Sequence, residues 1–211
     1  MTTEGELPPA GASGGGSTVA ELLERYIEVV TALAPHYPPA ARAPVPAPGC
    51  GEEDLERLAA ALGRPVPRQV ADLFRAANGV EAFQMFSVNL RSVETIAENL
   101  ERDTEWLSAE IDLVLDDTED ERLRSSFEGR RVVLAGGSDD RSDLVFFLLG
   151  PDPDAEWRVA ELVNGRWWEV PENCSPDVES WLSTLIDARE RASAWQNVGG
   201  PPSPTRPTRR S

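Results

Sequence analysis

The sequence predicts an α+β fold, with a mainly antiparallel sheet of about four to five strands and helices packed before and after it. Three observations lead to this prediction. Apolar residues follow helical spacing in the first half of the chain and again near its end. Short apolar runs of strand length occupy residues 131–135 and 143–149. Further along, Asn164-Gly165 is a two-residue turn pair that typically joins antiparallel strands.

The first residues predict a disordered leader, a helix and a stiff connector. Gly, Pro, Ser and Thr dominate residues 1–16, which form the leader. The helix begins at Ser17 or Thr18, since either side chain can cap free backbone amides. Six prolines follow the helix and predict an extended connector. Residues 17–48 are therefore an N-terminal helix and a proline-rich connector, ahead of an α+β domain over residues 49–198.

Two helices open that domain. The first covers residues 52–62, with acids in its first turn that complement the helix dipole and Gly63 as the residue that ends it. The second begins near Pro67 and closes at Asn78-Gly79, where both residues tolerate a positive φ.

A short strand and a long acidic segment come next. The strand is expected over residues 83–87, and a helix follows from Ser92. The stretch from Glu94 to Glu128 holds 13 acids against three arginines. Its densest part, residues 116–121, is expected to be a loop or a frayed helix end.

The later strands form a meander. Residues 131–135 are one strand, and residues 143–149 lack polar alternation, which predicts a central strand buried on both faces. Residues 157–163 and 166–170 form a hairpin around the Asn-Gly turn. A last helix is capped by Ser175.

Charge divides the chain into an acidic folded part and a basic tail. The formal net charge is −17, and all basic side chains are arginine, with no lysine. Residues 199–211 hold three arginines, four prolines and no apolar side chain, which predicts a disordered basic tail. Without the leader's two acids and the tail's three arginines, residues 17–198 carry −18. Such a surface repels phosphates, so nucleic acid is not an expected partner.

The inventory of reactive side chains disfavours an enzyme. The only histidine, His36, lies among prolines, so nucleophile activation by histidine and histidine-rich metal sites are not available. Cys50 and Cys174 lie far apart without a zinc or CxxC spacing, and reduced thiols are expected. We therefore predict no catalytic, cofactor-binding or metal-binding residues. With neither a signal peptide nor a long apolar run, we expect a cytoplasmic protein that does not contact a membrane.

Acidic clusters and tryptophans are the candidate partner-binding residues. The acids lack the spacing of a calcium loop, so a partner surface and a plain solvated face are the two interpretations. Adjacent tryptophans on a strand point to opposite faces, which puts one in the core and leaves the other as a surface anchor. The candidates are Asp116, Asp117, Glu119, Asp120, Asp139, Asp140, Trp167 and Trp168.

Five short motifs occur in a fixed order between residues 50 and 187. They are EEDLE with LGRPVP (52–67), FRAANG (74–79), GS with DLVFF (137–147), AELV (160–163) and DVESWL (177–182). This ordered set resembles the SUKH superfamily, whose best-known branch is the Smi/Knr family of cell-wall-synthesis regulators. Two features depart from the family pattern: Ser142 stands where a glycine is usual, and the segment over residues 106–128 is longer and more acidic.

The resemblance implies a protein-binding domain and gives no catalytic residues to transfer. Many bacterial members are similar to immunity proteins, which bind and neutralise a cognate toxin that is often a nuclease. Eukaryotic members act as regulators or scaffolds, so a regulatory protein without a toxin partner is the alternative. The acidic charge favours a basic protein partner such as a toxin domain. The sequence leaves the oligomeric state open.

Overall fold

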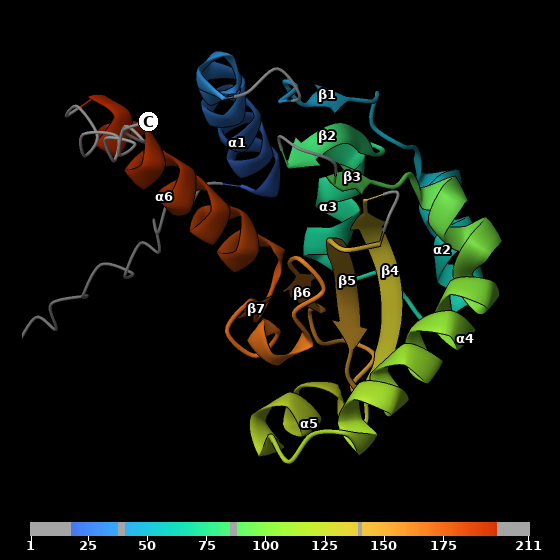
Figure 1. The fold of residues 1–211 in the computed structure, drawn as a ribbon. Coiled ribbons are helices and arrows are strands. Elements are labelled where there is room, and N and C mark those ends of the chain that lie inside the picture. Colours follow the sequence, from blue (N-terminus) through green and yellow to red (C-terminus); the bar gives the residue numbers. More distant parts are fainter. Residues whose placement is uncertain (1–17, 38–40, 85–87, 139–140, 198–211) are drawn as a thin grey trace, which may run out of the picture.

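The computed structural model describes residues 18–37, 41–84, 88–138 and 141–197. The predicted leader, residues 1–16, and the predicted basic tail, residues 199–211, lie outside the described residues. Along the chain the elements are α1 (Val19–Leu33), η1 (Ala34–His36), β1 (Val45–Pro46), α2 (Glu52–Leu62), α3 (Arg68–Ala76), β2 (Val80–Gln84), β3 (Val88–Leu90), α4 (Val93–Asp116), α5 (Glu121–Phe127), β4 (Arg131–Gly137), β5 (Leu144–Leu149), β6 (Arg158–Leu162), η2 (Trp167–Glu169), β7 (Cys174–Ser175) and α6 (Val178–Asn197) (Figure 1).

The strands form one antiparallel sheet whose order in space follows their order in the chain, from β1 to β7. The α+β class and the antiparallel arrangement are confirmed. The expected strand number of about four to five is wrong, because the sheet has seven strands. The additional strands are short: β1 and β7 have two residues each and β3 has three. Segments of this length carry no periodic pattern that a sequence can reveal.

The sheet separates two hydrophobic cores. β5 is buried along its whole length, as its continuous apolar run predicts. Its odd-numbered side chains, such as Phe147, share a core with residues of α1, α2, α3 and α6. Its even-numbered side chains, such as Phe146, share the second core with α5 and the second half of α4. The sheet is therefore the middle layer, with helices on both faces.

The N-terminal helix and the connector belong to this fold. Residues of α1 such as Tyr26 and Val30 are buried in the same core as those of α6 and α3. Figure 1 shows α1 and α6 side by side at one end of the sheet. The connector contributes β1, whose Val45 and Pro46 pair with β2. The first core thus includes residues on both sides of the predicted boundary at residue 48.

Helix α4 passes from one core to the other along the edge of β4 (Figure 1). β3 pairs with β4 only at Gly136 and Gly137. The helix covers the earlier part of this edge, where the Thr104 hydroxyl donates to the carbonyl of Val132 at 3.5 Å. A helix over a strand edge blocks pairing with another chain.

Local capping signals place several helix ends where the sequence predicts them. The Thr18 side chain accepts from the backbone of Glu21, and the Glu21 carboxylate accepts from the backbone of Thr18 at 2.8 Å. Helix α2 covers the predicted residues, and Gly63 ends it with φ of 69°. Positive φ costs glycine little because it has no Cβ.

Two strand predictions require correction. Residues 166–170 do not form a strand, because the chain turns at Asn164 and Gly165 into η2, and β6 pairs with β7 instead. Trp167 lies in this short helix and is buried in the second core. The single strand expected over residues 83–87 is two paired strands, β2 and β3, and residues 85–87 lie outside the described part.

Candidate functional site

The acidic cluster at residues 116–120 joins α4 to α5. Asp116 is the last residue of α4, Asp117 follows as its C-cap, and Glu119 lies in the connection; all three are exposed. Asp120 caps α5, since its carboxylate accepts from two backbone N–H groups of the first turn at 2.9 and 3.4 Å. Three of these four candidates are therefore available to a partner, and the fourth stabilises a helix.

More acidic side chains lie on the solvent side of α4. They recur at helical spacing, on the face opposite the buried residues. All are exposed, and none forms a salt bridge with a described residue. With the exposed acids of the connection they form the acidic face, made of Glu98, Glu101, Glu105, Asp112, Asp116, Asp117, Glu119 and Glu121.

The other candidates are placed differently. Trp167 is 8% exposed and lies near Phe127 and Phe146, with ring centroids 6.2 and 6.3 Å away, so it is the core member of the tryptophan pair. Trp168 follows it in η2, and its side chain lies outside the described part of the chain. Asp139 and Asp140 also lie outside the described residues.

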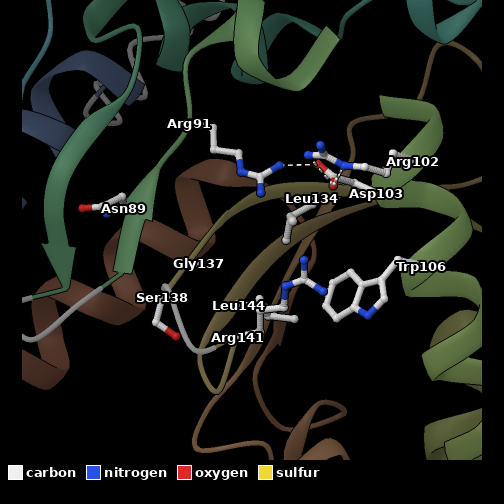
Figure 2. A pocket seen from close by; sticks show the side chains of 10 residues that line it. All are labelled: Asn89, Arg91, Arg102, Asp103, Trp106, Leu134, Gly137, Ser138, Arg141 and Leu144. Carbon is white, nitrogen blue, oxygen red and sulfur yellow. Dashed lines mark hydrogen bonds and ion pairs between the residues drawn. The ribbon is translucent and has the colours of Figure 1, made fainter. Parts of the chain in front are cut away.

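A pocket of about 320 Å³ opens between α4, the end of β3 and the connection from β4 to β5. Figure 2 shows two guanidinium groups around one carboxylate on one side, and a third guanidinium against an indole ring on the other. Apolar side chains of β4 and β5 lie between them. We call this the arginine pocket, lined chiefly by Arg91, Arg102, Asp103, Trp106, Leu134 and Arg141.

One carboxylate in the pocket is shared by two arginines. Asp103 lies on the inner side of α4 and is only 8% exposed. Arg91 and Arg102 both form salt bridges with it, the second at 3.4 Å between Nη2 and Oδ1. A single carboxylate balances one of the two cations. Among the described residues that line the pocket, three arginines and one aspartate therefore leave an excess of positive charge in a chain of net charge −17.

Arg141 has no carboxylate among the described residues within salt-bridge distance. Its guanidinium carbon lies 4.4 Å from the ring centroid of Trp106, which is a cation–π contact. Its backbone has φ of 59°, an unfavourable conformation for a residue with a Cβ. The Arg141 N–H donates to the carbonyl of Ser138 at 3.1 Å, which helps to hold this conformation.

The fold leaves room for the pocket because β3 is short and lies very close to β4. A Cβ on Gly136 would lie 2.3 Å from the carbonyl oxygen of Asn89, so only glycine allows this approach. The second core does not include residues of β3. Space therefore remains between the end of β3 and the middle of α4.

The remaining chemistry-bearing residues are dispersed. His36 is exposed in η1. Cys50 and Cys174 are free and half-buried, and burial raises the pKa of each thiol. Among the described residues, no group of three or more His, Cys, Asp or Glu side chains is arranged to hold a metal ion. None of the described helices combines the length and apolar character needed to cross a bilayer.

The comparisons with known proteins do not assign this chain to a family. No family model matches this chain. A search of curated proteins finds no match either. The resemblance to the SUKH superfamily therefore rests on the sequence motifs alone, and the functional argument rests on the acidic face and the arginine pocket.

The arginine pocket is the part of the site that sequence reasoning missed. One signal was present: the buried residues of α4 recur at Val93, Ile96, Leu100, Leu107 and Ile111, and Asp103 occupies a position of the same series. A charged residue in a buried series needs a partner, because an unpaired buried charge is costly. The partners come from α4 itself and from the residue just before its cap.

Proposed function

We propose that this chain is a non-enzymatic binding domain of the immunity type, which neutralises a basic toxin domain, such as a nuclease, by covering it. The observation that carries the proposal is the acidic face, whose carboxylates are exposed and without salt bridges to described residues. When the charges of a surface are paired within the protein, they largely cancel, and little electrostatic field reaches a partner. Here the exposed acids of α4, from Glu98 to Asp116, direct their field into solvent.

Electrostatics gives such a surface a specific advantage. A negative patch that faces a positive one speeds encounter and aligns the two proteins before short-range contacts form. The effect weakens with salt, since charges separated by more than about 8–10 Å are screened at physiological ionic strength. We therefore expect fast association that slows steeply as salt is added. Neutralisation inside a cell also places the protein in the cytoplasm, which is consistent with its two free cysteines.

The test uses the product of any toxin gene that lies beside this one, and it compares two double variants with the same change in charge. Glu101→Arg with Glu105→Arg reverses two neighbouring charges on the acidic face of α4. Glu24→Arg with Glu28→Arg reverses two exposed acids at the same spacing on α1. In Figure 1, α1 and α4 lie at opposite sides of the molecule.

Association rates at low salt distinguish the outcomes. We expect the α4 variant to associate about tenfold or more slowly, and the α1 variant to change by less than about threefold. Equal slowing in both variants would show that only net charge matters and would remove the acidic face as the interface. The absence of any complex with the toxin would instead favour a regulatory or scaffold role.

A further inference from the structure

We propose that the arginine pocket binds the phosphate group of a small phosphomonoester. The inference goes beyond the proposed function, because a cationic pocket is the wrong sign for a basic partner. The three arginines of the pocket come from different positions in the chain: Arg91 precedes α4, Arg102 lies within it, and Arg141 follows β4. The fold therefore gathers three guanidinium groups around one cavity in an acidic protein.

The three guanidinium groups keep N–H donors that no described residue of the protein uses. Each guanidinium has five N–H donors. Arg91 directs one nitrogen at Asp103, and Arg102 makes long contacts of 3.4 Å to the same carboxylate. The guanidinium of Arg141 makes no hydrogen bond or salt bridge to a described residue and only stacks on Trp106. These N–H groups can donate to the oxygens of an oxyanion without any existing pair being broken.

The arrangement suits a phosphate better than a carboxylate. A carboxylate is planar and is satisfied by one bidentate arginine. A phosphate monoester has three terminal oxygens that point in different directions and up to two negative charges. Guanidinium groups on two sides of the pocket can contact different oxygens of such a group (Figure 2). Counted over its described residues, the pocket has two more arginines than carboxylates, which favours an anion such as a phosphomonoester.

The size and the apolar part of the pocket indicate an organic group attached to the phosphate. About 320 Å³ is more than a phosphate ion fills, and it lies at the lower end of the range of small-molecule sites. Leu134, Leu144 and the Trp106 ring supply apolar surface next to the guanidinium groups. Apolar walls with a few convergent polar groups are typical of ligand pockets.

Several contacts also hold the arginines of the pocket in place, although Arg102 and Arg141 are exposed to solvent. Arg141 adopts a positive φ, which is unfavourable for a residue other than glycine. The backbone N–H of Arg91 donates to the carbonyl of Ala135 at 2.9 Å and ties this residue to β4. The carboxylate that orients Arg91 and Arg102 is itself buried. Preorganised donors lose little entropy when a ligand binds.

The experiment is calorimetric titration of the full chain at low ionic strength with AMP, adenosine and inorganic phosphate. We expect AMP to bind in the micromolar to millimolar range, phosphate more weakly, and adenosine not at all. Arg141→Gln weakens AMP binding about tenfold. The matched control is Arg122→Gln, an exposed arginine of α5 that pairs with Glu172 outside the pocket, and it changes affinity by less than about twofold.

A second variant separates the ligand site from a structural ion-pair cluster. Asp103→Asn keeps the shape of the side chain and one oxygen that can still orient the arginines, but it removes a negative charge that repels phosphate, so AMP binds more tightly while the protein is less stable to urea. If the cluster were only structural, Asp103→Asn would lower stability and no variant would bind AMP. The proposal is overturned by absence of AMP and phosphate binding at millimolar concentration, or by equal affinities of Arg141→Gln and Arg122→Gln. Preference for a peptide carboxylate over AMP would overturn the phosphate assignment.

Discussion

The hydroxyl of Tyr26 donates a hydrogen bond to the backbone carbonyl of Phe83 at 3.0 Å in the interior of the protein. Tyr26 belongs to α1 and Phe83 to β2, and their rings lie 4.6 Å apart. The pair links the N-terminal helix to the sheet across 57 residues of chain. Helix α1 thus helps to stabilise the sheet, and variants of Tyr26 can measure this contribution.

Tyr26→Phe tests the link with little change in packing. The variant leaves the carbonyl of Phe83 buried without this donor, which costs about 1–3 kcal/mol in the free energy of unfolding. The control is Thr184→Ala, which removes an exposed hydroxyl that donates to Ser180 at 2.9 Å and costs within about 0.5 kcal/mol. Urea unfolding measures both. Equal losses would contradict a stabilising role for the buried bond.

Alkaline pH tests the same side chain in another way. Burial raises the pKa of Tyr26 to about 12, against about 10 in an unfolded chain. Because the neutral phenol is favoured in the folded state, this contribution is fully present below pH 10 and is lost as the pH rises toward 12. The loss amounts to about 3 kcal/mol.

The chain suits this measurement because it has two tyrosines and no lysine, and its two free thiols are the same in the natural chain and in Tyr26→Phe. Urea unfolding as a function of pH gives the loss for the natural chain, and Tyr26→Phe should remove most of it. Absorbance of tyrosinate should show one tyrosine that ionises late and only with unfolding. Parallel pH profiles in the two proteins would show that Tyr26 does not carry the effect.

Local signals explain why the helices were predictable. The ends of α1 and α2 depend on residues within one turn, such as Thr18, Glu21 and Gly63, so the sequence contains the whole cause. The short strands differ, because a two-residue strand such as β7 forms only when β6 is already there to pair with it. The Asn164-Gly165 turn was recognised, but the chain after it forms η2 and not the returning strand of a hairpin.

The candidate site shows the same division. Exposed acids at helical spacing are visible along a single segment, so the sequence could indicate Asp116, Asp117 and Glu119. The arginine pocket combines residues from three segments, and only the packing of α4 against β4 brings Asp103 and Arg141 to one cavity. Contacts between distant segments have no signature in the periodicity of any one of them.

Gly136→Ala tests the close approach of β3 and β4 that shapes the pocket. A Cβ at residue 136 would lie 2.3 Å from the Asn89 carbonyl oxygen, so the strands must separate. We expect a loss of about 1–3 kcal/mol in the free energy of unfolding. Gly150→Ala is the matched control, because no heavy atom lies within 4 Å of the added carbon, and it should be neutral within about 1 kcal/mol. Equal effects would show that the approach is not constrained.

Added salt should stabilise the protein, because it screens the repulsion between the carboxylates of the acidic face. Glu98, Glu101 and Glu105 follow one another at three- and four-residue spacing on α4, where like charges destabilise a helix by about 0.2–0.5 kcal/mol a pair. Screening removes this repulsion, so Tm should rise with sodium chloride, and Glu101→Gln should raise Tm at low salt. Glu53→Gln is the control, because Glu53 faces Arg57 at 4.0 Å and its neutralisation removes an attraction. If both substitutions raised Tm equally, the repulsion would come from the net charge of the whole chain and not from the acidic face. If salt lowered Tm, attraction and not repulsion would dominate this surface.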